Sequence, residues 1–143
     1  MTTVKHNAMT NHSGAMNPSN LASVAMLAAR VLLASIFVLS GLSKIVSQGP
    51  TEAYMQALGI PGALLWPTIL FEIVAGMLVI MGYQTRISAL LMAGFCLVTA
   101  AIFHHQFSDQ IQMIMFLKNV SMAGGFLLLA SVGGGPISLD KRS

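Results

Sequence analysis

Residues 67–83 form an almost unbroken apolar run, PTILFEIVAGMLVIMGY, with a single acid, Glu72, near the middle. A carboxylate halfway along a membrane helix almost always faces other protein groups, and it is a functional-site hypothesis by default. Of the 143 residues, 55% are hydrophobic and only 8% are charged, whereas a typical soluble domain carries about 25% charged residues. We therefore predict a single domain that folds in a lipid bilayer.

The apolar residues fall into four blocks, each long enough to cross a hydrocarbon core of about 30 Å as a helix. The predicted spans are residues 21–45, 64–81, 86–103 and 112–132. Glycines and prolines flank the segment TEAYMQAL between the first two spans, which predicts a loop or a short surface helix there. The predicted fold is an all-α, integral membrane four-helix bundle over residues 21–139, with a disordered polar tail over residues 1–20 and a polar C-terminal tail over residues 140–143.

Composition excludes several kinds of site. The net charge of +3 contains no basic run and no basic patch interleaved with aromatic residues, so nucleic acid is not an expected partner. The single cysteine, Cys96, cannot form an intrachain disulfide or a CxxC pair, which excludes dithiol chemistry by this chain alone. His6 and His12 in the tail, and His104 with His105 after the third span, lack the further ligands of a zinc site, so no metal site is expected.

Four spans place both termini on the same side of the membrane. With that side in the cytoplasm, the inner loops and tails hold four cations, Lys5, Arg86, Lys141 and Arg142. Only Lys44 and Lys118 then lie toward the outer end. The excess of Lys and Arg on the inside predicts that both termini are cytoplasmic.

The expected partners of Glu72 are cations on the inward faces of neighbouring spans. Arg30 and Lys44 share one face of the first span with Phe37, and Lys118 lies in the fourth span. Counting depth at about 1.5 Å per residue, we expect Lys44 near the surface and Glu72 between Arg30 and Lys118. Such a cluster is either a structural clamp between helices or a site that touches a substrate or a proton.

Several short sequence features follow one another along the chain in a characteristic order. They are Arg30, Phe37, Ser40-Gly41 and Lys44; the turn Leu58-Gly59-Ile60-Pro61; Glu72 with Gly76; the hairpin residues Gly82 and Thr85-Arg86; Phe103-His104; and Lys118-Asn119 with Gly124-Gly125. This order resembles the DoxX family of small four-helix bacterial inner-membrane proteins. The resemblance covers about residues 28–139. It implies a multi-pass protein of the bacterial inner membrane.

The resemblance also implies a membrane subunit of a quinone- or thiol-linked redox system. Its partners would be the lipid bilayer and other membrane or redox-complex subunits. Glu72 and His104 are the catalytic candidates, since a carboxylate or an imidazole can handle the proton of a quinone. The residues expected to line the pocket are Arg30, Phe37, Lys44, Glu72, His104, Lys118 and Asn119.

The chain has no GxGxxG motif, no paired cysteines and no evident haem ligands, so a partner or a quinone must supply any redox chemistry. Two alternatives to an oxidoreductase subunit stay open. The first is a non-enzymatic carrier of a small solute or a proton, suggested by ionisable residues on three of the four spans. The second is a structural or assembly partner in a membrane complex.

Overall fold

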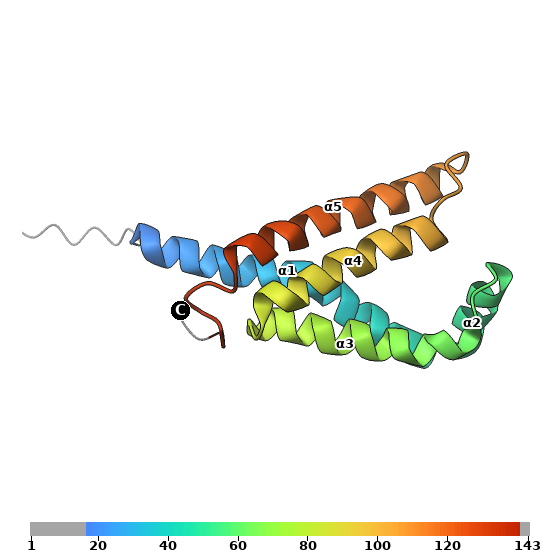
Figure 1. Cartoon of the computed structure of the whole chain (residues 1–143), viewed down its shortest axis with the longest axis horizontal. Coiled ribbons are helices and arrows are strands. Elements are labelled where there is room, and N and C mark those ends of the chain that lie inside the picture. Colours follow the sequence, from blue (N-terminus) through green and yellow to red (C-terminus); the bar gives the residue numbers. More distant parts are fainter. Residues whose placement is uncertain (1–16, 141–143) are drawn as a thin grey trace, which may run out of the picture.

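The computed structural model describes residues 17–140, which are helical with no β-strand among them. The helices are α1 (Pro18–Val46), α2 (Gln48–Ala57), α3 (Leu65–Met81), α4 (Thr85–Phe103) and α5 (Gln110–Val132), with a 3₁₀ turn (Gly62–Leu64) before α3 (Figure 1). All except α2 are long and apolar enough to cross a membrane. The predicted all-α bundle of four spans is confirmed, and α2 is the surface helix expected between the first two.

Capping groups explain where the helices begin. α1 starts at Pro18, three residues earlier than predicted, because the Asn17 side chain accepts a hydrogen bond from the backbone N–H of Ser19. α5 starts at Gln110 because the carboxylate of Asp109 accepts hydrogen bonds from the N–H groups of Ile111 and Gln112. The predicted tail over residues 1–20 is therefore too long at its C-terminal side, and residues 1–16 and 141–143 lie outside the described part.

The long helices form two antiparallel pairs, α1 with α3 and α4 with α5 (Figure 1). A tight turn joins α3 to α4, with Gly82 and Gln84 both in the left-handed backbone region at φ values of 69° and 50°. The pairs lie close together at this turn and diverge toward α2. We call the end that holds the α3–α4 turn and residues 133–140 the terminal end, and the opposite end the α2 end.

Two glycines let the backbones of α1 and α3 approach closely. A Cβ atom at Gly41 would lie 2.7 Å from Cγ1 of Ile73, and one at Gly76 would lie 2.8 Å from Cγ2 of Val38. Small residues at helix contacts are the usual means of tight packing in membranes, where the hydrophobic effect does not drive helices together.

Aromatic and sulfur-containing side chains join the two pairs in the middle of the bundle. The ring of Phe37 packs edge-on against Phe95 and Phe126, with centroid separations of 6.2 and 5.6 Å. Met92 and Cys96 are fully buried in the same cluster. This core holds α1 and α3 against α4 and α5, so the helices can separate only at the α2 end.

The packing of α1 on α3 predicts that Gly76→Leu lowers the free energy of unfolding in detergent by about 1–3 kcal/mol, because the new side chain must displace Val38 or the backbone of α1. Gly94→Leu in α4 is the matched control, since nothing lies within 4 Å of the Cβ position there. Unfolding by denaturant, followed by circular dichroism, measures both variants. Equal stability of the two would contradict the close approach.

Candidate functional site

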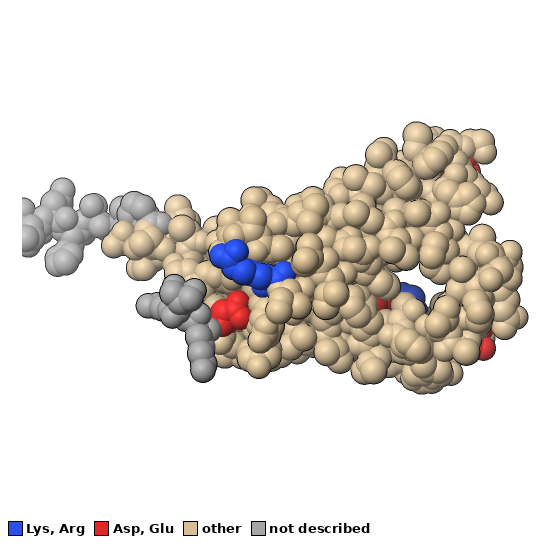
Figure 2. Space-filling model, in the orientation of Figure 1, with Lys and Arg blue, Asp and Glu red and all other residues tan. Residues whose placement is uncertain are grey.

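The divergence of the two helix pairs leaves a cavity of about 1240 Å³ at the α2 end. Figure 2 shows the opening in the surface, with acidic and basic atoms visible inside an otherwise uncharged rim. All five helices contribute to its wall, which is mostly apolar. Phe71, Phe95 and Phe103 supply aromatic surface, and the polar groups are few.

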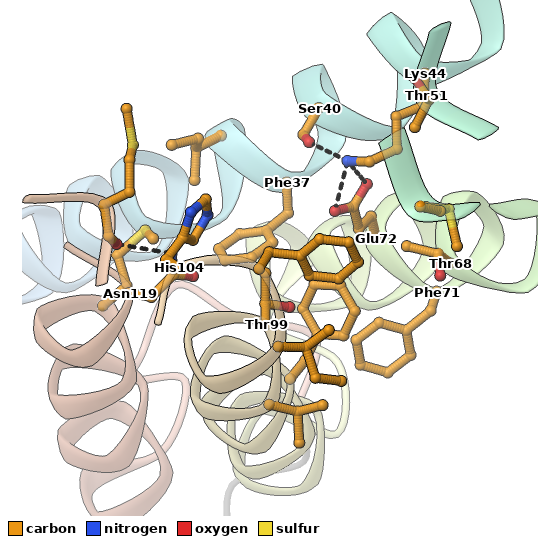
Figure 3. Close-up of a pocket in the computed structure, with 18 of the residues that line it drawn as sticks. Phe37, Ser40, Lys44, Thr51, Thr68, Phe71, Glu72, Thr99, His104 and Asn119 are labelled. Atoms are coloured by element: carbon orange, nitrogen blue, oxygen red, sulfur yellow. Dashed lines mark hydrogen bonds and ion pairs between the residues drawn. The ribbon is translucent and has the colours of Figure 1, made fainter. Parts of the chain in front are cut away.

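An ion pair between α1 and α3 lies in the cavity wall. Lys44 Nζ donates to both carboxylate oxygens of Glu72, at 2.9 and 2.8 Å, and to Oγ of Ser40, at 2.5 Å (Figure 3). These three bonds use all three ammonium hydrogens. The side chain of Glu72 is only 6% exposed, whereas that of Lys44 is 24% exposed. The carboxylate is therefore inside the protein, and the lysine connects it to the cavity.

The prediction that Glu72 pairs with Arg30 or Lys118 is wrong. Glu72 is the eighth residue of α3, about 11 Å from its start at the helical rise, and Lys44 lies beside it on the adjacent helix. Arg30 is fourteen residues earlier in α1, about 21 Å away along the axis. Lys118 is on α5, across the cavity, and is exposed. Counting residues along the helix placed the ammonium group of Lys44 too close to the membrane surface. The side chain in fact extends back along α1 toward Ser40.

Arg30 lies at the terminal end and does not line the cavity, which corrects its place among the pocket candidates. Its Nη2 donates to the carbonyl oxygen of Ile137, after α5. The other six candidates do line the cavity: Phe37, Lys44, Glu72, His104, Lys118 and Asn119.

His104 and Asn119 approach the cavity from α4 and α5. Nδ1 of His104 lies 2.9 Å from Oε1 of Gln112, and Nδ2 of Asn119 donates to the carbonyl oxygen of Met115 at 3.0 Å. In the neutral imidazole that donates from Nδ1, Nε2 remains an acceptor. Asn119 likewise keeps its side-chain oxygen for another donor, so both residues have hydrogen-bonding capacity beyond these contacts.

The sequence analysis missed polar residues that only the fold brings to the cavity. Ser40 is one turn before Lys44, and this spacing could have revealed it as a partner of the ammonium group. Thr51 and Tyr54 come from α2, and Tyr54 stacks on Phe103 with ring centroids 5.9 Å apart. The sequence of α2 has no periodic pattern that would have predicted how this helix lies over the cavity or which of its residues contact it.

The ionisable groups of the cavity are Lys44, Tyr54, Glu72, His104 and Lys118. Within residues 17–140 no three His, Cys, Asp or Glu side chains lie close enough together to hold a metal ion. The arrangement can therefore bind an apolar molecule and offer it hydrogen bonds or a proton.

A sequence profile of the DoxX family matches residues 25–105, more than half of the chain. The chain belongs to the DoxX family. Two relatives in Escherichia coli (strain K12) extend the similarity. Inner membrane protein YqjF is 42% identical over 121 residues, covering 85% of this chain and 93% of the relative. Inner membrane protein YphA is 41% identical over 126 residues, covering 83% and 90%. No solved structure gives a significant match.

These relatives and the four candidate spans make this DoxX protein a multi-pass protein of the bacterial inner membrane. The DoxX match includes the ion pair and His104, and it ends before α5. Lys118 and Asn119 of α5 therefore complete the cavity from outside the matched region.

The ion pair predicts that Glu72→Gln destabilises the protein, because it strands a partly buried ammonium group. The free energy of unfolding should fall by less than the loss of about 3–5 kcal/mol that is typical when a fully buried pair is broken, because Lys44 keeps contact with the cavity. Adding Lys44→Met should recover part of this loss, with a coupling energy of about 1–3 kcal/mol in detergent unfolding.

Lys118→Met is the matched control for the double-variant cycle. Its effect should add to that of Glu72→Gln with no coupling, because Lys118 makes no ion pair among the described residues. Coupling of Glu72 to Lys118 instead of Lys44 would contradict the observed pairing.

Proposed function

We propose that this DoxX protein binds a hydrophobic redox molecule of the quinone class in the cavity, as the membrane subunit of a redox system. One observation carries the proposal: a large, mostly apolar cavity between two helix pairs has a buried ion pair in its wall. Pockets for drug-sized ligands are about 300–1,000 Å³ and combine apolar walls with a few polar groups. The cavity exceeds this range and has the same character.

The residues present fit such a molecule. Phe37, Phe71 and Phe95 offer flat apolar surface to a ring, and Figure 3 shows the labelled phenylalanines beside the ion pair. Lys118, on the α5 side of the cavity, is a hydrogen-bond donor that can meet a carbonyl oxygen, and Nε2 of His104, an acceptor in the neutral ring, can meet a hydroxyl group. A bound quinone supplies two-electron, two-proton redox chemistry, which none of these side chains provides.

The polar residues of the cavity divide the work of binding and proton transfer. Lys44 holds the carboxylate of Glu72 with two charge-assisted hydrogen bonds. His104 is half-buried at the end of α4, where its Nε2 can exchange a proton with water. We assign proton exchange to His104. The ion pair of Lys44 and Glu72 would hold two fixed charges beside the bound ring.

The closed middle of the bundle argues against the carrier alternative. Phe37, Met92, Cys96 and Phe126 are buried between the helix pairs, so an apolar core lies between the cavity and the terminal end. A transported solute would require this core to open. A lipid-soluble ligand needs access only from the α2 end, which the divergence of the helices provides.

Electrons must come from outside this chain. The sole cysteine, Cys96, is buried in the apolar core, and the sequence has no nucleotide-binding motif. We therefore propose a partner subunit that exchanges electrons with the bound molecule at the α2 end.

We propose that the termini are cytoplasmic, on the basis of the positive-inside distribution. Single cysteines at Ser108, in the α4–α5 loop, and at Leu139, near the C-terminus, are exposed and suit labelling of intact cells. The native Cys96 is buried and gives little background. Labelling by an impermeant maleimide is expected at position 108 and not at 139, and the reverse pattern would invert the orientation.

Quinone binding is testable in the purified protein. The single tryptophan, Trp66, directly precedes the cavity residues Pro67 and Thr68. A short-chain quinone should quench its fluorescence along a saturable curve. Thr99→Phe places a ring in the cavity and should weaken binding about tenfold, which corresponds to about 1.4 kcal/mol.

The matched control is Leu97→Phe, which adds the same ring to the exposed face of α4, outside the cavity. It should bind as the unmodified protein does. Quenching that never saturates, or that is equal in the two variants, would mean partition into detergent and would overturn the proposal.

A further inference from the structure

A second cavity, of about 1060 Å³, lies at the terminal end. The α3–α4 turn, the start of α4 and residues 133–140 form its wall. It shares no lining residue with the cavity at the α2 end. What it binds is therefore a separate question from the function proposed above.

Arg30 lies beside this region with unused hydrogen-bonding capacity. It is the largest fully buried side chain, 1% exposed. Nη2 donates to Ile137, whereas Nε and Nη1 have no partner among the described residues. A guanidinium group carries five N–H donors, and burying them without acceptors is costly. The arginine is thus short of acceptors in the structure as it stands.

Thr85, the first residue of α4, also has an unused polar group. Its Oγ1 is buried and has no partner among the described residues. Its backbone N–H donates to both carboxylate oxygens of Asp140, at 3.3 and 3.1 Å. The N-terminus of a helix attracts anions through its free N–H groups and its dipole. The chain's own carboxylate occupies that anion position.

Residues 133–140 are held over Arg30 and Thr85 at very close range. A Cβ atom at Gly134 would lie 2.6 Å from Oγ1 of Thr85 and 3.0 Å from Oδ2 of Asp140, and one at Gly82 would overlap the Arg30 guanidinium. Cβ of Ser138 lies 2.5 Å from the Cβ position of Gly82 and 2.8 Å from that of Gly134, so the segment packs against the α3–α4 turn beside Arg30 and Thr85.

Few backbone hydrogen bonds attach residues 133–140 to the helices. The N–H groups of Leu139 and Asp140 donate to the carbonyl oxygens of Met81 and Gly82, at 3.2 and 2.8 Å. The segment leaves α5 through Gly133, Gly134 and Gly135, two of which have positive φ values of 83° and 77°. Consecutive glycines impose little resistance to a change of path. These glycines are therefore the positions at which the segment can change its direction relative to α5.

We propose that Arg30, Thr85 and the N-terminus of α4 form a binding site for a phosphate group, which Asp140 occupies in this structure as an internal substitute. A phosphate group brings more acceptor oxygens than a carboxylate and so supplies the partners that Arg30 and Oγ1 of Thr85 lack. Arg86, at the rim, donates to the carbonyl oxygen of Ser131 at 2.9 Å and adds positive charge.

Two sources share this chemistry: free phosphate and the phosphodiester of an anionic phospholipid. The start of α4 lies at the end of a span, at the depth where headgroups lie. Exchange of Asp140 for a phosphate would release residues 133–140 from the bundle. The site would then couple the C-terminus to the anion content of its surroundings.

The experiment compares Asp140→Asn with the unmodified protein. In neutral detergent at constant ionic strength, inorganic phosphate is titrated and the unfolding temperature recorded. Asp140→Asn removes the competing charge, so half-maximal stabilisation should need about tenfold less phosphate. In a parallel arm, nanodiscs of phosphatidylcholine with or without phosphatidylglycerol, followed by native mass spectrometry, report bound lipid.

Asp109→Asn is the matched control, because Asp109 caps α5 in the same way as Asp140 caps α4 but has no buried arginine beside it. This variant should show no increase in its stabilisation by phosphate or in its binding of phosphatidylglycerol. Arg30→Met in the Asp140→Asn background removes both charges together and should abolish the gain, and Thr85→Val should reduce it.

A response to phosphate supports a soluble ligand, and a response to phosphatidylglycerol alone supports a lipid headgroup. If Asp140→Asn responds to neither, or if Arg30→Met leaves the gain intact, the proposal is overturned and residues 133–140 only cap the bundle. Quinone binding at the α2 end is measured separately and does not bear on this result.

Discussion

The ion pair of Lys44 with Glu72 is the interaction around which the first helix pair is arranged. A carboxylate in an apolar span must face protein, and its cation must reach it from the same depth. α1 meets both conditions because Gly41 and Gly76 bring its backbone close to α3. The pair therefore fixes how α1 and α3 are aligned along their axes. It also places two charges in the wall of a cavity that is otherwise mostly apolar.

The two ends of the bundle differ because the core between the helix pairs is short. Around Phe37 aromatic and sulfur-containing side chains are buried between the pairs, whereas toward α2 the pairs diverge. The α2 end is consequently open to a molecule that can enter from the lipid. At the terminal end, residues 133–140 join the α3–α4 turn by backbone hydrogen bonds and border the second cavity.

Arg30 and Glu72 illustrate two solutions to a charge inside a membrane bundle. Each carboxylate oxygen of Glu72 accepts a charge-assisted hydrogen bond from the same lysine, Lys44. Among the residues that the structure describes, Arg30 has a single carbonyl partner, and the nearby carboxylate of Asp140 accepts hydrogen bonds from the start of α4. A carboxylate that is already hydrogen-bonded to a lysine of the same chain is suited to a rigid part of the cavity wall. A buried cation short of acceptors suits a site where another anion can replace the chain's own.

The sequence by itself determined the membrane, the number of spans, their bounds to within three residues and the family, because apolar length, glycine turns and motif order are local properties of the chain. Of the seven residues that it proposed for a pocket, six line the cavity, since inward faces follow from helical spacing. The partner of Glu72 and the place of Arg30 were decided by the tertiary structure. Counting residues gives a depth along each helix, but an ion pair also requires that two helices be neighbours and that their side chains meet. That lateral arrangement, with α1 against α3 and α5 against α4, arises from packing between segments far apart in the chain.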